Sequence, residues 1–297
     1  MNKTQKIMVA VATISAVSIA GYQMYWAYVS DKYGQHLPTV EIDVNGVKRE
    51  YNLFVPENPP ADQMPLVILL NGGDAQSWRF PQQRMWESLG EEVGIAIVVP
   101  VGKRLPPNEG AWQLDTEDES YHDIHYISTI IEDLASKHSL DEARRYAVGY
   151  SLGSMFTYEL ACHMSDSFAA IASHAGTMPV TPKACDPERN VPIMHIHGVL
   201  DSVIAYGNTW DWKNWESVGT MQDIPGLVEF WRDRYQCQNE SSSEAQDETH
   251  FVYHACAQGT RVEHYRLAKG DHGWPETLNG TPTYEVIWSF LNRYTLP

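Results

Sequence analysis

The chain has 297 residues, of which 43% are hydrophobic and 20% are charged. Those proportions are ordinary for a packed globular protein and exclude disorder over most of the length. The 21 Lys and Arg residues are outnumbered by 38 Asp and Glu, so the formal net charge is -17. No run of basic residues is longer than a pair. We therefore do not expect nucleic-acid binding, because an acidic chain repels phosphate backbones.

Residues 1–20 are typical of an export segment. Lys3 and Lys6 precede an apolar stretch from Ile7 to Ala20, whose last residues are small enough to suit a signal peptidase. An uncleaved membrane anchor is the alternative, because the apolar character continues to Val29 and is then long enough to span a bilayer. With either fate, a linker over 21–38 and the rest of the chain are expected outside the cytoplasm, secreted or periplasmic.

The cysteines fit an exported protein. There are four, Cys162, Cys185, Cys237 and Cys256, and an even count outside the cytoplasm favours disulfides over buried thiols. Three pairings are open. We prefer the bridges between sequence neighbours, Cys162 with Cys185 and Cys237 with Cys256. The polar stretch 239–249 then reads as a loop that returns the chain from Cys237 to Cys256.

Strand signals begin with a hairpin over Thr39 to Pro56. Asn45-Gly46 supplies its two-residue turn, and the apolar residues on either side alternate. Farther along, the pattern changes to short continuous apolar runs, as expected for strands buried on both faces of a parallel sheet. These runs are 66–70, 95–99, 146–148, 168–172 and 193–196. A further strand is expected over 262–267.

Helical signals lie between the strands and fix the fold class. One helix is predicted around Ile124 to Leu134, one from Ser151, and two over Pro225–Tyr235 and Tyr284–Tyr294. Strands that alternate with helices predict an α/β fold with a mostly parallel central sheet flanked by helices. No internal repeat or linker divides the chain, so 39–297 is expected to form one domain.

The segment Gly149-Tyr150-Ser151-Leu152-Gly153 follows an apolar strand and opens a helix. That context is the one a nucleophile elbow requires: the flanking glycines leave room for a sharp turn that pushes the serine hydroxyl out above the sheet. An ordinary glycine-bounded turn is the alternative interpretation. We expect Ser151 to be a nucleophile.

A second loop, Asn71-Gly72-Gly73-Asp74, follows the strand 66–70 directly. In serine hydrolases with an elbow of this kind, the loop at that place and the residue after the nucleophile supply the backbone N–H groups of the oxyanion hole. Gly73 and Leu152 are the corresponding candidates here. A simple glycine turn is again the alternative.

A serine nucleophile needs a base and an acid, which follow it in the order acid and then histidine. Of the 12 histidines, His272 is the best candidate for the base, because it sits in a glycine-bracketed loop after a strand. Asp201 follows the strand 193–196 and would orient the imidazole. His195 and His197 alternate on that strand and could share an ion, but only Asp201 follows at a useful spacing, so no metal site is expected.

With these motifs, the chain resembles the secreted polyhydroxybutyrate depolymerase and feruloyl esterase group of α/β-hydrolases, which also includes acetyl xylan esterases. The resemblance covers residues 39–297. It rests on Leu69 to Gly73, the elbow, Phe168 to Ala172, His195 to Gly198 with Asp201, and above all Asp271-His272-Gly273-Trp274-Pro275. It departs from the group where Asn71 replaces a usual histidine and where Ser154 replaces a frequent glycine.

The resemblance implies an α/β-hydrolase catalytic domain with Ser151 as nucleophile, Asp201 as acid and His272 as base. The expected function is an exported serine esterase that needs no cofactor and acts on a small or polymeric ester: a polyhydroxybutyrate-type polyester, or feruloyl or acetyl esters of polysaccharides. A serine peptidase is the alternative among enzymes. A non-catalytic adhesion or carbohydrate-binding protein is the alternative outside them.

Two tryptophans are candidates for substrate binding. Trp274 follows His272 by two residues, and Trp112 lies on the loop after the strand 95–99, on the side where catalytic loops gather in such sheets. Together they would form a flat-walled apolar groove for an aromatic acyl group or a polyester segment. The alternative is that either ring belongs to the core.

Overall fold

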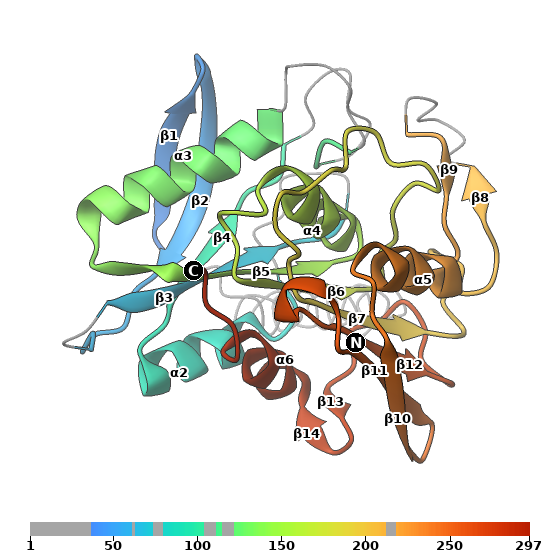
Figure 1. Ribbon diagram of the computed structural model, residues 1–297. Coiled ribbons are helices and arrows are strands. Elements are labelled where there is room, and N and C mark those ends of the chain that lie inside the picture. Colours follow the sequence, from blue (N-terminus) through green and yellow to red (C-terminus); the bar gives the residue numbers. More distant parts are fainter. Residues whose placement is uncertain (1–36, 61–62, 74–79, 104–110, 115–121, 212–217) are drawn as a thin grey trace, which may run out of the picture.

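A twisted sheet of ten strands forms the centre of the molecule (Figure 1). The computed structural model describes residues 37–60, 63–73, 80–103, 111–114, 122–211 and 218–297. Six neighbouring strands run parallel and, apart from the first half of β5, are almost wholly buried, as expected for strands covered on both faces. In spatial order they are β4 (Ala96–Pro100), β3 (Met64–Leu70), β5 (Leu140–Tyr150), β6 (Ala170–His174), β7 (Ile193–Gly198) and β12 (Val262–Leu267).

An antiparallel hairpin flanks each edge of the parallel strands. The expected N-terminal hairpin is present as β1 (Thr39–Val44) and β2 (Val47–Phe54). Its turn residues have the positive φ angles that a two-residue turn requires, 51° at Asn45 and 84° at Gly46.

The hairpin at the other edge corrects an expectation. The polar stretch 239–249 is not a loop: it forms the edge strand β10 (Asn239–Ala245), the turn and the start of β11 (Glu248–His254). Every residue of β10 is exposed. The strand is therefore held by backbone hydrogen bonds to β11 alone, and it carries none of the apolar alternation by which strands are recognised.

Five helices of the described chain cover the two faces of the sheet (Figure 1). On one face, α2 (Gln83–Val93) and α6 (Thr283–Leu291) bury Trp86, Leu89, Ile287 and Phe290. On the other face lie α3 (His122–Lys137), α4 (Leu152–His163) and α5 (Ile224–Arg234). Short pieces complete the described chain: the paired strands β8 (Trp210–Asp211) and β9 (Thr220–Met221), the pair β13 (Thr277–Leu278) and β14 (Thr281–Pro282), and the 3-10 turn η1 (Ala257–Gly259).

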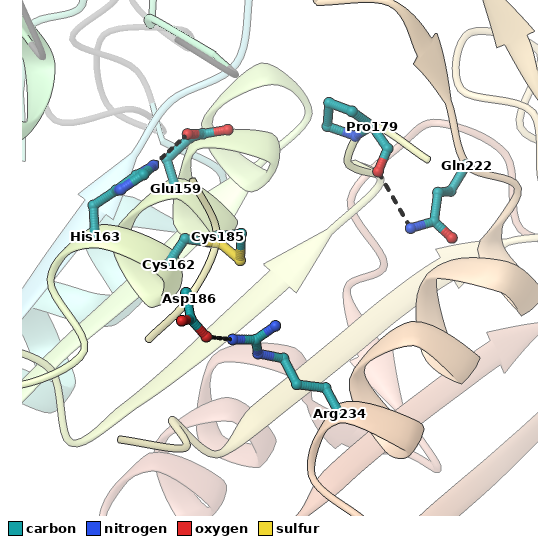
Figure 2. Close-up of a disulfide and its surroundings, with 8 residues drawn as sticks. All are labelled: Glu159, Cys162, His163, Pro179, Cys185, Asp186, Gln222 and Arg234. Atoms are coloured by element: carbon teal, nitrogen blue, oxygen red, sulfur yellow. Dashed lines mark hydrogen bonds and ion pairs between the residues drawn. A yellow bond between two sulfur atoms is a disulfide. The ribbon is translucent and has the colours of Figure 1, made fainter. Parts of the chain in front are cut away.

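Two disulfides tie the α4 and α5 face together, and they are the two bridges preferred from the sequence. Cys162 is joined to Cys185, and Cys237 to Cys256. Figure 2 shows the first bridge fastening the end of α4 to the segment between β6 and β7. Beside it, Arg234 at the end of α5 forms an ion pair of 2.7 Å with Asp186 of the same segment. The segment is thus anchored from two helices.

The expected α/β fold, with a mostly parallel sheet flanked by helices, is confirmed. The signal or anchor over 1–20 and most of the linker over 21–38 lie outside the described residues. Among the residues that are described, no helix is long and apolar enough to cross a membrane.

Candidate active site

The turn that carries Ser151 is strained and tightly enclosed. Ser151 has a φ of 54° and a ψ of −120° between the end of β5 and the start of α4. A side chain at either flanking glycine would collide with backbone, because a Cβ at Gly149 would lie 2.3 Å from the Gly153 carbonyl oxygen. At Gly153 it would lie 2.2 Å from the Leu70 carbonyl oxygen. The packing of α4 against β3 and β5 thus holds the serine in a conformation typical of a nucleophile elbow.

Three residues far apart in the sequence meet at the carboxyl end of the sheet. His272 Nε2 lies 2.9 Å from Ser151 Oγ, and His272 Nδ1 lies 2.8 Å from Asp201 Oδ2. An ionised carboxylate only accepts, so Nδ1 carries the proton and Nε2 is free to accept the serine proton. The His272 side chain is 20% exposed, whereas that of Asp201 is fully buried. The His272 end of this hydrogen-bonded series therefore reaches solvent, whereas the Asp201 end is buried in the protein.

Asp201 is held as a carboxylate by its surroundings. Its Oδ1 accepts hydrogen bonds of 2.8 Å from the backbone N–H groups of Val203 and Ile204. Its Oδ2 accepts from His272, and His197 Nε2 lies 3.3 Å from the same oxygen. Burial acts to raise the pKa of Asp201, but the hydrogen bonds from the two histidines and the two N–H groups outweigh it and lower that pKa well below its usual range.

The expected oxyanion loop lies directly beside the serine. A Cβ added to Gly72 would lie 2.7 Å from the Cβ of Ser151, so the backbone of this loop can approach Ser151 only because residue 72 is glycine. Gly73 follows with a φ of 88°, and Leu152 is the first residue of α4. Helix N-termini present free N–H groups and favour negative charge. The two predicted N–H donors thus come from elements that flank Ser151 on either side.

Trp112 does not line a groove, and this corrects its expected role. Its side chain is completely buried, with the ring stacked on Phe156 of α4 at 5.1 Å. Its Nε1–H donates a 2.8 Å hydrogen bond to the carbonyl oxygen of Asn71. The side chain therefore supports the oxyanion loop from beneath. The sequence predicted that Trp112 lies on the loop after β4, but it could not show that the ring points into the core and not toward a substrate.

Trp274 is only partly buried and lies within an aromatic cluster beside the serine. The centroid of its ring lies 5.3 Å from that of Phe80, 6.0 Å from that of Tyr150 and 5.0 Å from that of His174. Its Nε1–H donates to Gln82 Oε1 at 3.1 Å. Since Tyr150 directly precedes Ser151, the position is compatible with the expected contact to an acyl group, which stays a prediction.

His195 and His197 are the residues whose arrangement the sequence analysis did not foresee. Their rings are hydrogen-bonded to each other, with 3.1 Å between His195 Nε2 and His197 Nδ1. The other nitrogens also have protein partners, Tyr158 for His195 and the Ile204 carbonyl for His197. Within the described ranges, no group of three or more His, Cys, Asp or Glu side chains is placed to hold a metal ion. The alternation of the two histidines was the available signal, but it pointed to a shared face and not to Asp201.

Comparisons with known proteins relate the chain to esterases. The family model named Esterase, with the description "Putative esterase", matches residues 44–276. A bifunctional acetylxylan esterase/xylanase of Neocallimastix patriciarum is 25% identical over 258 residues, which are 84% of this chain and 34% of that protein. Feruloyl esterase B of Piromyces equi is 23% identical over 228 residues, 76% of this chain and 41% of that protein. The chain thus spans less than half the length of these two relatives.

Solved structures show the same fold. An acetyl xylan esterase from Aspergillus awamori aligns with a TM-score of 0.62 at 12% identity, over 86% of this chain and 99% of that one. A thermostable esterase aligns with a TM-score of 0.57 at 22% identity, over 90% of this chain and 64% of that one. The α/β-hydrolase fold and the resemblance to feruloyl and acetyl xylan esterases are thereby confirmed. Because the family match covers most of the domain, from the N-terminal hairpin to the loop of His272 and beyond, the chain belongs to the Esterase family.

Proposed function

We propose that the chain is a serine esterase that hydrolyses carboxylic esters, with Ser151 as nucleophile, His272 as base and Asp201 as acid. The observation that carries this proposal is the series of hydrogen bonds from Ser151 through His272 to Asp201, 2.9 and 2.8 Å long, at a strained strand-to-helix turn. Membership of the Esterase family supports it.

The first half of the reaction acylates the serine. Ser151 Oγ attacks the ester carbonyl carbon while His272 Nε2 takes its proton, and the carbonyl oxygen becomes an oxyanion. The Gly73 and Leu152 N–H groups hold that oxyanion. When the tetrahedral intermediate collapses, the imidazolium of His272 gives its proton to the leaving alcohol. Asp201 stabilises the imidazolium through Nδ1–H and keeps the ring in the correct tautomer.

The second half releases the acid. A water molecule gives a proton to His272 Nε2 and attacks the acyl carbonyl, so a second oxyanion forms at the same N–H groups. Return of the proton to Ser151 Oγ breaks the ester to the serine and frees the carboxylic acid. These steps use protein groups and water.

The substrate we propose is an ester of a plant polysaccharide, with an acetyl or feruloyl acyl group. The names of the relatives support this class, since they are acetylxylan and feruloyl esterases. A polyester of the hydroxybutyrate type is the competitor implied by the motif resemblance. The proposed location is outside the cytoplasm, which two disulfides and the apolar stretch that follows Lys3 and Lys6 support.

A panel of substrates tests the proposal. The purified chain should hydrolyse p-nitrophenyl acetate and a methyl ferulate or acetylated xylan, and a fluorophosphonate probe should label Ser151 and abolish both activities. Turnover of a peptide anilide faster than of the matched ester would favour the peptidase. Absence of both probe labelling and turnover in folded protein would contradict the enzyme and favour a non-catalytic protein.

A further inference from the structure

The carboxylate of Asp201 contacts two imidazoles, one partly exposed and one fully buried. His272 approaches Oδ2 from the solvent side at 2.8 Å, and His197 approaches the same oxygen from the interior, with its Nε2 at 3.3 Å. The ring of His197 is fully buried on β7. Its Nε2 also lies 3.0 Å from the Ile204 carbonyl oxygen, so one N–H is shared between the loop backbone and the carboxylate.

The loop that carries Asp201 needs such an anchor. The neighbouring side chains Leu200 and Val203 are 60% and 61% exposed, so the acid stands on a short surface loop. Two backbone N–H groups fix its Oδ1. Within the described part of the chain, Oδ2 has His272 and His197 as its side-chain partners. Because His272 must move protons during turnover, His197 is the partner that can hold Oδ2 in place throughout.

His197 is in turn held from deeper in the protein. Its Nδ1 lies 3.1 Å from His195 Nε2, and His195 Nδ1 lies 2.8 Å from the hydroxyl of Tyr158 on α4. Ser173 Oγ lies 3.2 Å from the same His195 nitrogen and is hydrogen-bonded to Ser154 Oγ. Ser154, near the start of α4, thus takes part in this buried polar network.

With both imidazoles neutral, one set of tautomers satisfies every partner. A carbonyl oxygen only accepts, so the Ile204 carbonyl requires the proton of His197 to be on Nε2. Nδ1 of His197 then accepts from His195 Nε2–H, and Nδ1 of His195 accepts from the hydroxyl of Tyr158. All donors in this series point from the core toward Asp201.

The electrostatics of the first two members agree with that assignment. Burial lowers the pKa of His195 well below its usual value, and the neighbouring His197, His264 and His174 act in the same direction. Burial raises the pKa of Tyr158, so its hydroxyl keeps the proton that it donates. His195 is therefore neutral, and it needs a donor at Nδ1 and an acceptor at Nε2.

We propose that His197 is a positioning residue that fixes the carboxylate of Asp201, and that His195 and Tyr158 hold it in the donating tautomer. This inference rests on the function proposed above. Without the N–H of His197, the carboxylate is free to tilt on its loop, and His272 loses alignment with Ser151. Misplacement of a base by about 1 Å costs up to about 100-fold in rate. The negative charge of Oδ2 would also fall on His272 alone and favour its protonated form.

Two amide substitutions separate positioning from packing. In His197→Gln the side-chain NH₂ reaches the place of Nε2 and can still donate to Asp201. In His197→Asn it reaches only the place of Nδ1, so Asp201 and Ile204 lose their donor while a polar group stays beside His195. We expect His197→Gln to keep kcat within about threefold. We expect His197→Asn to lower kcat about 10- to 100-fold, with KM within about twofold.

The pH profile supplies a readout that a merely structural role would not move. In His197→Asn the acid limb of kcat/KM for p-nitrophenyl acetate should move to higher pH by about half a unit or more, and His197→Gln should restore it. The titratable and charged groups around His197 are the same in both variants: Tyr158, His174, His195, Asp201, Tyr206, His264, Arg266 and His272. Equal kcat values and equal acid limbs for wild type and His197→Asn would overturn the inference, and so would equal losses in both variants.

Failure of the proposed function looks different, because the wild type itself would then show neither ester turnover nor fluorophosphonate labelling. Should His197→Asn not fold, ¹⁵N NMR of ring-labelled wild-type protein decides the matter. The inference requires a proton on His197 Nε2 across about pH 6 to 8. An unprotonated Nε2 in that range would overturn it, since the ring would then have nothing to donate to Asp201.

Discussion

The two sides of Asp201 use the same residue type for opposite purposes. On the outer side, the His272 side chain is 20% exposed and is hydrogen-bonded to Ser151, the proposed nucleophile. On the inner side, His197 is fully buried and bonded to another histidine and a backbone carbonyl. Access to substrate and water, rather than residue identity, separates a base from a support. Changes on the outer side should therefore alter activity directly, whereas changes on the inner side should alter stability and reach activity only through the position of Asp201.

The largest effect is expected on the outer side, from Ser151→Ala. Loss of the nucleophile should lower kcat about 10⁴- to 10⁶-fold. The midpoint of thermal unfolding should stay about the same, because the change removes one hydroxyl and keeps the Cβ, so the strain of the positive φ is unchanged. Ester turnover and calorimetry on the same preparation check both halves.

Ser154→Ala is the matched control, since that serine lies one helical turn farther along and is buried against Ser173. It should keep most of the turnover. Retention of more than a tenth of the activity in folded Ser151→Ala protein would contradict the assignment of the nucleophile.

The inner side should be the weak point in acid. Burial lowers the pKa of His174, His195 and His264, the last to about 3. These histidines stay neutral in the folded chain but take up protons in the unfolded chain below about pH 6.5, so their contribution to stability is lost as pH falls from there. Each costs on the order of 1 kcal/mol at pH 5.5, so the three together cost a few kcal/mol.

Urea unfolding at pH 7.5 and 5.5 measures this loss. His264→Gln should reduce the difference between the two free energies of unfolding by on the order of 1 kcal/mol. His125→Gln changes an exposed histidine on α3 and should leave the difference as it is. The same pH dependence in all three proteins would show that groups other than the buried histidines cause the acid sensitivity.

Most of the fold was predictable because its strands are apolar on both faces. β10 and α2 were not. The edge strand β10 is wholly exposed and carries no apolar signal. The buried face of α2 includes Gln83, Glu87 and Gly90, while Met85 and Val93 of the same helix face solvent. In both elements, contacts to neighbours outweigh the local pattern from which sequence prediction starts.

In the site, the sequence predicted the residues whose motif defines a local shape, such as the turn at Ser151. It could also order Asp201 and His272 along the chain, and the structure brings both to the serine. The roles of Trp112 and His197 depended on contacts between distant segments. The ring of Trp112 turns inward to Asn71, and the loop from Asp201 to Ile204 folds back over His197.

The disulfides should affect stability without reaching the reactive serine. Replacing Cys162 and Cys185 together by alanine should lower the free energy of unfolding by about 2 to 4 kcal/mol. Their separation is 23 residues, and that of Cys237 and Cys256 is 19, so the second double variant should lose a similar amount. Cys162 lies near the far end of α4 from Ser151, about 16 Å along the helix. Urea unfolding and ester turnover of both double variants test this, and a tenfold loss of kcat in folded protein would contradict it.

Trp274 and Trp112 extend the comparison between exposed and buried residues of the site to two tryptophans. Trp274, half-buried beside Tyr150, should contribute to the binding of a large acyl group, because its ring offers a flat apolar surface. We expect Trp274→Ala to lower kcat/KM for feruloyl esters about 10- to 100-fold and to spare acetyl esters, whose acyl group is too short to reach the ring.

Trp112→Phe is the matched variant on the inner side. It removes the hydrogen bond to Asn71, so it should lower stability by about 1 to 3 kcal/mol and change both esters by one common factor. Kinetics on the two ester classes distinguish the cases. Equal losses on acetyl and feruloyl esters in Trp274→Ala would mean that this ring only supports Tyr150 and His272, and both tryptophans would then belong to the supporting side of the site.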